Sequence, residues 1–340
     1  MRVRSVAELE GWLSKPSPRL VDDIGALDGD ILVLGAGGKL GPSLVRLALR
    51  AVSAAGTRAR VVAVSRFSEP GLADALRDDG ADVIVADVAD DASLAALPDA
   101  ANVVFLVGAK FGTSGREHAT WFTNAYLPGR VAQRFAGARV AALSTGNVYP
   151  LVPIAAGGCT EDDAPDPVGE YAMSCLGRER VFSHFAELHG TRLALLRLNY
   201  AVELRYGVLV DVARAVHAGQ PIDVGMGHVN VVWQGYANEV TLRSLRHAAC
   251  PPRVLNVTGP ETVSIRRVAT DLGRLLGREP TLVGAEADTA LLSNASQCHR
   301  LFGYPDVTLA ELVERTAGWV ADDLPTLGKP TSFQTRDGRF

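Results

Sequence analysis

Short apolar runs rich in β-branched residues alternate with helical stretches along the chain up to about residue 200. Continuous apolar runs of this length are typical of parallel strands that are buried on both faces. Strands alternating with helices predict a doubly wound parallel sheet, a Rossmann-type α/β fold, because right-handed crossovers place helices on both faces. We expect strands over residues 31–34, 60–65, 82–85, 102–107, 139–144 and 192–198.

The rhythm changes after about residue 200, where helices and isolated short strands follow one another. This change predicts a smaller α/β C-terminal lobe beside the main sheet. The expected elements of the lobe are helices over 208–218, 237–247 and 264–276 and strands over 229–233 and 254–257.

Both ends of the chain lie outside this pattern. Residues 6–15 form a short amphipathic stretch that Pro16 and Pro18 end, whereas residues 325–340 show little periodicity. The predicted organisation is an N-terminal arm (1–28), a Rossmann domain (29–200), a substrate-binding lobe (201–324) and a C-terminal tail or arm laid over another surface (325–340).

The composition narrows the classes of function. With 340 residues, 47% of them hydrophobic, the chain can bury a sizeable core. Acidic and basic residues number 38 and 34, for a net charge of −4, and no basic tract favours nucleic acid or an anionic membrane surface. No apolar stretch is long enough to span a bilayer, and residues 1–13 do not resemble a signal peptide. We therefore expect a cytoplasmic protein without nucleic-acid or membrane partners.

The cysteines and histidines indicate neither disulfides nor a metal site. Cys159, Cys175, Cys250 and Cys298 are scattered without a Cys-x-x-Cys pair, which fits reduced thiols better than a disulfide framework or a zinc site. The seven histidines form no cluster with the spacing of metal ligands. No bound metal is expected.

A glycine-rich turn follows the first strand and opens a helix expected over residues 40–54. Glycine lets the backbone turn sharply and approach a pyrophosphate, whose charge then lies on the free N–H groups of the helix N-terminus. The alternative is a strand-to-helix turn that binds nothing, since the spacing differs from the usual Gly-x-Gly-x-x-Gly. As a dinucleotide site, the turn would contribute Gly35, Gly37, Gly38, Lys39, Leu40 and Gly41.

The ends of the second and third strands bear on the choice of dinucleotide. Ser65 and Arg66 stand where an NAD-preferring site places an acidic side chain for the ribose 2′-hydroxyl. Arg66 suits a 2′-phosphate instead, which slightly favours NADP over NAD, although an exposed arginine without a ligand would give the same sequence. Asp87 and Val88 follow the third strand, where they either meet the adenine amino group or form a simple turn.

Several motifs occur in a fixed order, which is a more specific signal than the glycines alone. They are Gly35-x-x-Gly38-x-x-Gly41, Asp87, Leu143-Ser-Thr-Gly-Asn-Val-Tyr149, Tyr171, Arg197-Leu-Asn199-Tyr200 and Asn256-Val-Thr-Gly-Pro260. Over residues 30–276 the chain thereby resembles the extended short-chain dehydrogenase/reductases, the NAD-dependent epimerase/dehydratase family. The resemblance implies NAD(P) as cofactor, a small hydroxylated substrate, and a homodimer paired through helices 121–135 and 171–188, the first of which Pro128 interrupts.

The resemblance also implies roles for single residues. In that family a tyrosine takes the proton from a substrate hydroxyl, a Ser or Thr orients the same oxygen, and the dinucleotide exchanges hydride. Tyr171 and Thr145 match these positions, although a lone helical tyrosine is more often a half-buried packing residue. Further expected cofactor residues are Val107, Gly108, Tyr171 and Asn199, and expected substrate residues are Asn147, Tyr200, Arg205, Asn230, Trp233 and Gln234.

The chain departs from the family's Tyr-x-x-x-Lys pattern, because Cys175 stands where the lysine would be. That lysine holds the nicotinamide ribose and lowers the pKa of the tyrosine. A tyrosine with a pKa near ~10 is phenolate in only about one molecule in a thousand at pH 7. Two residues offer a substitute cation, Lys110 in the loop 107–112 and Arg178 one turn further along the helix. We favour Lys110 as a catalytic and cofactor-binding residue, the alternative being a surface lysine.

A second departure concerns the substrate. Sugar-nucleotide 4,6-dehydratases carry an Asp-Glu pair after the catalytic threonine, whereas this chain has Gly146 and Asn147, which exchange no proton near neutral pH. The stretch 228–234 holds no arginine or lysine for a diphosphate, and its amide and aromatic side chains suit an uncharged hydroxylated ring. Arg205 is a single cation that either pairs with a carboxylate or ties down a loop.

The residues are compatible with two functions. The first is an NAD(P)-dependent oxidoreductase or epimerase that acts on a secondary hydroxyl of a sugar, sugar acid or similar polyol, and not a 4,6-dehydratase. The alternative is a non-catalytic or weakly catalytic dinucleotide-binding sensor or assembly protein. The joint presence of Thr145 and Tyr171 favours the enzyme. Cys175 as a nucleophile is disfavoured, because no histidine is spaced to activate it.

Overall fold

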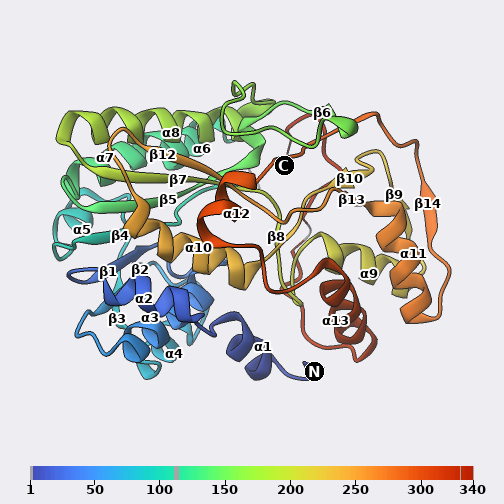
Figure 1. Ribbon diagram of the computed structural model, residues 1–340, viewed down its shortest axis with the longest axis horizontal. Helices are drawn as coiled ribbons and strands as arrows, with labels where there is room; N and C mark the ends of the chain where they lie inside the picture. The colour runs from blue at the N-terminus through green and yellow to red at the C-terminus, as the bar shows by residue number, and fades with distance from the viewer. Residues whose placement is uncertain (1–2, 111–114, 330, 340) are drawn as a thin grey trace.

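Seven parallel strands form the central sheet of the computed structural model, which describes residues 3–110, 115–329 and 331–339. The strands are β1 (Ile31–Leu34), β2 (Val61–Ser65), β3 (Asp82–Val85), β4 (Asn102–Phe105), β5 (Arg139–Thr145), β7 (Arg192–Leu198) and β12 (Arg253–Val257). Their spatial order is β3-β2-β1-β4-β5-β7-β12, at the left of Figure 1. The predicted doubly wound parallel sheet is therefore confirmed.

The central strands are continuously apolar because both of their faces are covered. All four residues of β1 and all four of β4 are buried. Asn102 is the one polar residue of these two strands. Its side-chain amide donates to the backbone carbonyl oxygens of Asp28 and Asp30 and so connects β4 to the segment just before β1. The edge strand β3 is only partly buried, as expected for a strand with one neighbour.

Helices cover both faces of the sheet (Figure 1). One face carries α2 (Pro18–Gly25), α3 (Gly41–Ala55), α4 (Leu72–Asp78) and α10 (Gln234–His247), and the other α5 (Asp91–Ala95), α7 (Leu127–Arg134) and α8 (Gly169–His189). Leu20, Leu44 and Leu242 belong to the core of the first face. Val131 and Phe182 belong to the core of the second. The sheet thus separates two hydrophobic cores.

Contrary to the prediction, Pro128 does not interrupt its helix. The helical path runs through α6 (Glu117–Trp121) and the π-helical turn η1 (Phe122–Tyr126) directly into α7. Pro128 lies in the first turn of α7, where a missing N–H is tolerated. The wider π-helical turn before it keeps the path continuous.

Two elements expected in the C-terminal lobe belong to the main sheet instead. β12 pairs in parallel with β7, with Val254 opposite Leu195. α10 packs against the sheet beside α3, with Leu242 and Leu245 in that core. The predicted boundary at residue 200 is corrected accordingly, because the chain leaves the sheet, builds part of the lobe and returns.

The predicted strand over residues 229–233 is two short strands that pair with different partners. β10 (His228–Val229) pairs antiparallel with β13 (Val263–Ser264), and β11 (Val232–Trp233) pairs in parallel with β8 (Ala201–Val202). Two further small pairs join distant segments: β9 (Pro221–Asp223) with β14 (Thr281–Val283), and β6 (Val152–Pro153) with β15 (Thr289–Ala290).

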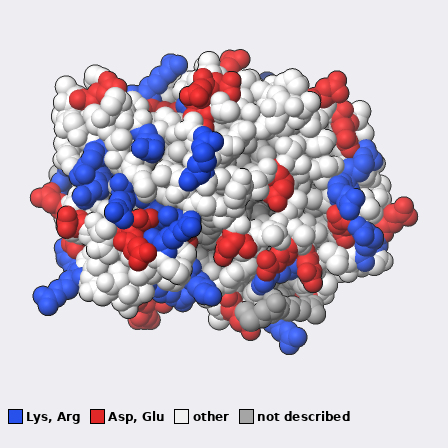
Figure 2. All heavy atoms as spheres, in the orientation of Figure 1, with Lys and Arg blue, Asp and Glu red and all other residues white. Residues whose placement is uncertain are grey.

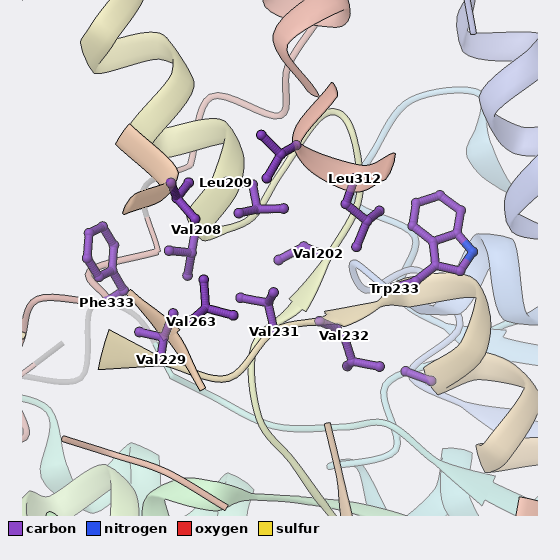
Figure 3. Close-up of a cluster of buried hydrophobic side chains, with 14 of the residues drawn as sticks. Val202, Val208, Leu209, Val229, Val231, Val232, Trp233, Val263, Leu312 and Phe333 are labelled. Atoms are coloured by element: carbon purple, nitrogen blue, oxygen red, sulfur yellow. The ribbon is translucent and has the colours of Figure 1, made fainter. Parts of the chain in front are cut away.

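The smaller lobe, at the right of Figure 1, has its own apolar centre. Its helices are α9 (Val208–Ala218), α11 (Ile265–Leu276), α12 (Ser296–Phe302) and α13 (Leu309–Ala321). Figure 3 shows side chains from well-separated segments meeting there, among them Val202, Val208, Val229, Val263 and Phe333.

Both chain ends are built into this lobe. Leu9 and Leu13 of α1 (Val6–Leu13) are buried in its core, and the Trp12 ring stacks on that of Trp233 with centroids 4.0 Å apart. At the other end, the Thr331 backbone N–H and hydroxyl both donate to the Asp211 carboxylate. The C-terminal residues therefore form an arm laid over α9 rather than a free tail.

Basic and acidic side chains are intermixed on the face shown in Figure 2. Within the described ranges, no helix is both long and apolar enough to cross a membrane. The same residues contain no group of three or more histidine, cysteine or carboxylate side chains placed to hold a metal ion.

Candidate functional site

The glycine turn between β1 and α3 has no room for side chains. Gly35 lies at φ +88°, and a Cβ there would come within 3.1 Å of the Leu106 and Val107 backbone. A Cβ on Gly37 would lie 2.8 Å from the Ser65 hydroxyl, and one on Gly41 would overlap the Ala36 carbonyl. Glycine is therefore required at Gly35 and Gly41, a side chain at Gly37 would displace Ser65, and Gly41 serves the close packing of the helix on the turn.

A cavity of about 380 Å³ opens in front of this turn, at the carboxyl ends of β1, β2, β3 and β4. This is the edge where ligands of parallel α/β sheets bind. The predicted cofactor residues that line the cavity are Gly35, Gly37, Gly38, Ser65, Arg66, Asp87, Val88, Val107 and Gly108. Lys329, from the C-terminal arm, also lines it and was not predicted.

The turn presents backbone donors suited to an anion. In the described part of the chain, the N–H groups of Gly37, Lys39 and Leu40 make no backbone hydrogen bond, whereas Gly38 N–H donates to the Gly35 carbonyl. Donors at the start of α3 also lie at the positive end of its helix dipole. Glycines without side-chain space and unused N–H groups together fit the pyrophosphate of a dinucleotide.

Arg66 and Asp87 face each other across the rim of this cavity. The guanidinium of Arg66 lies 3.8 Å from the carboxylate of Asp87, and both side chains are exposed. Asp87 also accepts the Ala89 backbone N–H in a local turn. β2 ends in Ser65 and Arg66 without an acidic residue.

A second cavity of about 220 Å³ lies on the other side of the glycine turn, at the carboxyl ends of β5 and β7. It brings together residues far apart in the sequence. The predicted site residues that line it are Lys39, Leu40, Lys110, Thr145, Asn147, Tyr171, Asn199 and Tyr200. The remaining lining includes Tyr206 and Thr331, which the sequence did not indicate.

The side chains of Tyr171 and Thr145 both line this second cavity. Thr145 is the last residue of β5 and caps the short 3₁₀ helix η2 (Gly146–Val148), while Tyr171 lies in the first turn of α8. Burial and the neighbouring Cys175 raise the pKa of Tyr171, whereas Arg178 and the Thr145 hydroxyl act in the opposite direction. The two hydroxyls are thus placed together in one cavity.

Lys110 lies beside this tyrosine. Its Nζ is 5.9 Å from the centroid of the Tyr171 ring and 5.7 Å from that of the Tyr200 ring. Burial lowers the pKa of Lys110 to about 8, although the adjacent Cys175 counteracts this. Val107 and Gly108 of this loop line the first cavity and Lys110 lines the second, while residues 111–112 lie outside the described ranges.

Arg178, the other candidate cation, lines neither cavity. Its guanidinium donates to the Leu143 carbonyl and to the Asn124 side chain, and it is buried behind the wall. Its charge still favours the phenolate form of Tyr171.

Cys175 occupies the place of the missing lysine. Its side chain is buried one helical turn from Tyr171. Burial raises the pKa of the Cys175 thiol, so the neutral thiol is favoured. The position therefore carries no positive charge.

Lys39 has a second role beyond the glycine turn. Its side chain reaches into the second cavity, where Nζ donates to the Ala201 carbonyl at 3.1 Å and lies 3.3 Å from the centroid of the Tyr206 ring. Burial lowers the pKa of Lys39 to about 7, partly offset by Glu203 and reinforced by Lys110. The sequence pattern placed Lys39 only among the cofactor residues.

Three of the expected substrate residues lie elsewhere, and the prediction is corrected. Asn230 donates to the Glu261 carbonyl and accepts the Ser293 N–H, Trp233 stacks on Trp12, and Gln234 donates to Ser43. All three are buried in packing contacts and line neither of the two cavities.

Arg205 likewise lines neither cavity. Its guanidinium forms ion pairs with Glu10 at 2.7 Å and with Glu203 at 3.1 Å. These contacts join the loop after β8 to the N-terminal arm. Arg205 therefore ties down a loop, which is the second of the two alternatives that the sequence offered.

Comparisons with known proteins support the fold. A model of the NmrA-like family matches residues 28–119, and no curated protein matches the chain by sequence. Similar solved structures include UDP-glucuronic acid 4-epimerase from Bacillus cereus in complex with UDP-glucuronic acid and NAD (TM-score 0.72, 19% identity, 86% of this chain and 98% of that one). MoeE5 in complex with UDP-glucose and NAD (0.69, 21%, 87% and 99%) and UDP-glucose 4-epimerase from Thermotoga maritima with UDP-glucose (0.69, 16%, 86% and 99%) are also similar. These structures share the Rossmann-type fold that the resemblance implied.

Proposed function

We propose that this protein is an NAD(P)-dependent oxidoreductase or epimerase that acts on a secondary hydroxyl of a sugar, sugar acid or similar polyol. The observation that carries the proposal is the meeting of Thr145 and Tyr171, with Lys110 beside them, in a cavity that shares the glycine turn with a larger neighbouring cavity. The similar solved structures that contain NAD support this choice of cofactor class.

The residues around the first cavity would hold the dinucleotide. The N–H groups of the glycine turn would receive its pyrophosphate, and Asp87 with Val88 would meet the adenine. The nicotinamide ring supplies a hydride acceptor or donor when it is bound. We infer a modest preference for NADP, because Arg66 at the end of β2 suits a 2′-phosphate and no acidic residue stands there.

The protein's own part in the reaction is to orient the substrate and move a proton. Thr145 would hold the substrate hydroxyl oxygen, and Tyr171 would take its proton as general base. Because burial raises the pKa of Tyr171, the phenolate needs a nearby positive charge. Lys110 would supply that charge in place of the lysine that Cys175 replaces.

The second cavity lacks the groups that a 4,6-dehydratase needs. Gly146 carries no carboxyl group, and a Cβ there would lie 3.1 Å from the Ser293 hydroxyl. The Asn147 amide oxygen accepts the Thr145 hydroxyl and does not titrate. The proposal therefore excludes loss of water by this route.

One observation favours a second candidate, a dinucleotide-binding sensor with little or no turnover. The cation normally found one turn after the tyrosine is replaced by a neutral buried thiol. If Lys110 does not act on Tyr171, the tyrosine stays protonated at neutral pH and proton transfer is slow.

We also infer a homodimer that pairs through α6, η1, α7 and α8. Trp121, Phe122, Tyr126 and Met173 are large apolar side chains that are each at least 37% exposed on these helices. Exposed apolar groups that gather on neighbouring elements mark interaction surfaces. Light scattering at micromolar protein checks this, and a monomer mass would rule it out.

The central experiment combines titration with a substrate screen. Calorimetric titration with NAD and NADP should show binding of at least one, and sugars, sugar acids and polyols should then be screened for cofactor reduction or for epimerised product. Dinucleotide binding with hydride transfer supports the enzyme. Binding without hydride transfer to any hydroxyl leaves the sensor, and no binding of either dinucleotide overturns both.

A further inference from the structure

Lysine is rare in this chain and concentrated at the candidate site. Among 34 basic residues only four are lysines, Lys15, Lys39, Lys110 and Lys329. Lys39 and Lys110 line the second cavity and Lys329 the first, whereas Lys15 is exposed and lines neither. Lysine differs from arginine in being a compact point charge that can lose its proton when buried. Its use here indicates a task that the abundant arginines do not perform.

The described lining of the second cavity is positive and contains no carboxylate. It consists of the two lysines, six hydroxyl-bearing side chains, two asparagine amides, one glycine and four aliphatic residues. The nearest carboxylates lie behind the wall and are already engaged: Glu203 pairs with Arg205, and Asp211 accepts both donors of Thr331. Two ammonium groups in one desolvated space therefore favour a ligand with negative charge.

The cavity is also small, because the C-terminal arm closes its lobe side. Thr331 lines the wall and is held by Asp211. Two residues further on, Phe333 is buried beside Val208, Val229 and Val263 (Figure 3). The arm therefore cannot move without exposing an aromatic side chain to water. The volume of about 220 Å³ is below the roughly 300–1,000 Å³ of sites for drug-sized ligands.

We propose that the substrate is a small hydroxy acid, a sugar acid or a shorter hydroxylated carboxylate without a nucleotide, whose carboxylate is bound by Lys39 and Lys110. The inference rests on the proposed function, since the reacting hydroxyl lies at Thr145 and Tyr171 in the same cavity. Lys39 is the anion-binding residue that the sequence pattern did not reveal. Lys110 contributes charge both to the carboxylate and to the tyrosine. A phosphate ester is disfavoured because its larger, doubly charged group leaves less of this volume for the reacting carbon.

Matched substrates test the inference. With each dinucleotide in turn, the probes are glucose, gluconate, glucuronate, glucose 6-phosphate and UDP-glucuronate, together with short neutral polyols and their acids. We expect kcat/KM for the acids to exceed that of their neutral parents by about tenfold or more, which corresponds to one charge-assisted contact. Thermal unfolding of the dinucleotide-saturated protein should show the same selectivity, because a ligand that binds the native state raises Tm.

Variants locate the contact. Lys39→Met should raise KM for the acids by about tenfold to a hundredfold while leaving the Kd of the dinucleotide within about twofold, and Lys39→Gln serves if the methionine variant does not fold. Lys15→Met, a change of the same kind at an exposed site, should alter neither value.

Three outcomes overturn the inference: neutral sugars turned over as well as their acids, a lower KM for glucose 6-phosphate or UDP-glucuronate, or no acid-selective turnover and no acid-selective rise in Tm. The first two leave the proposed function intact, since hydride transfer still occurs. Acid-selective binding without hydride transfer would support the anion site and count against the proposed enzyme.

Discussion

The two cavities on either side of the glycine turn are built by different means. The first is made largely of backbone: a glycine-rich turn, unused N–H groups and the ends of four adjacent strands. The second is made of side chains from distant segments, including Lys39, Lys110, Thr145, Tyr171 and Thr331. A cavity made of backbone can therefore be specified by short motifs, whereas a cavity made of side chains depends on how separate segments meet.

The largest expected effect is on proton transfer in the second cavity. Tyr171→Phe removes the general base but little volume, so activity should fall by about 10²–10⁴-fold with dinucleotide affinity nearly unchanged. Steady-state kinetics and calorimetry check both. Tyr304→Phe, at a tyrosine that is 70% exposed, is the control. Equal activity of the two variants would remove Tyr171 from the mechanism.

Dinucleotide binding to the first cavity should be lost when a side chain blocks the approach to its backbone. Gly38→Val places a side chain where even a Cβ would lie 3.2 Å from the Gly35 carbonyl, which blocks close approach of a pyrophosphate. Dinucleotide binding should weaken by about a hundredfold or more. Gly11→Val, at a glycine with open space around it, should bind as the wild type does. Unchanged calorimetric affinity in Gly38→Val would mean that the site is misplaced.

The role of the cation beside Tyr171 is tested by removing its charge. Lys110→Met should reduce turnover by about tenfold to a thousandfold, because each unit of tyrosine pKa changes the phenolate fraction tenfold. The double variant with Tyr171→Phe should be little worse than either single one, since the two residues act as a unit. The basic limb of the pH profile belongs to this pair rather than to Tyr171 alone.

Cys175→Lys distinguishes the two positions of the charge. If Lys110 already acts on Tyr171, a second ammonium in the same buried space should lower stability or dinucleotide affinity. A rise in turnover well above wild type, with no effect of Lys110→Met, would instead identify a weakened enzyme or a sensor.

A smaller effect is expected at the rim of the first cavity. Arg66→Ala should weaken the binding of NADP by about threefold to tenfold and the binding of NAD by less. The reason is that only NADP has a 2′-phosphate for the exposed guanidinium to contact. Titration with both dinucleotides measures the difference. An equal loss for the two would end the proposed NADP preference.

The smallest effect concerns stability and pH. Lys39 has a pKa of about 7 in the folded protein against about 10.4 in an unfolded chain, so the unfolded state binds more protons between these values. The free energy of unfolding should therefore rise by about 1 kcal/mol between pH 7 and pH 8 from this group. Glu203, Asp211 and Lys110 also act on Lys39 and are unchanged in Lys39→Met. Denaturant unfolding should show a flatter pH dependence in that variant, and an identical slope would contradict the lowered pKa of the buried Lys39.

The local structures follow from the residues of each segment. Runs such as Ile31–Leu34 are buried strands because every residue is apolar, and the turn at Gly35 follows because only glycine fits its backbone and its neighbours. Thr145 and Tyr171, which the motifs predict as catalytic residues, line one cavity, since each lies at the end of a strand or the start of a helix that the fold class positions.

Only the tertiary structure decided which distant segments meet. β12 joined the main sheet because strand pairing depends on partners some sixty residues away, here Val254 with Leu195. Trp233 does not line the second cavity, because its ring stacks on that of Trp12 near the other end of the chain. The same holds for Lys39, whose long flexible side chain can point to either cavity. Its direction is set by Ala201 and Tyr206, which no local pattern places beside it.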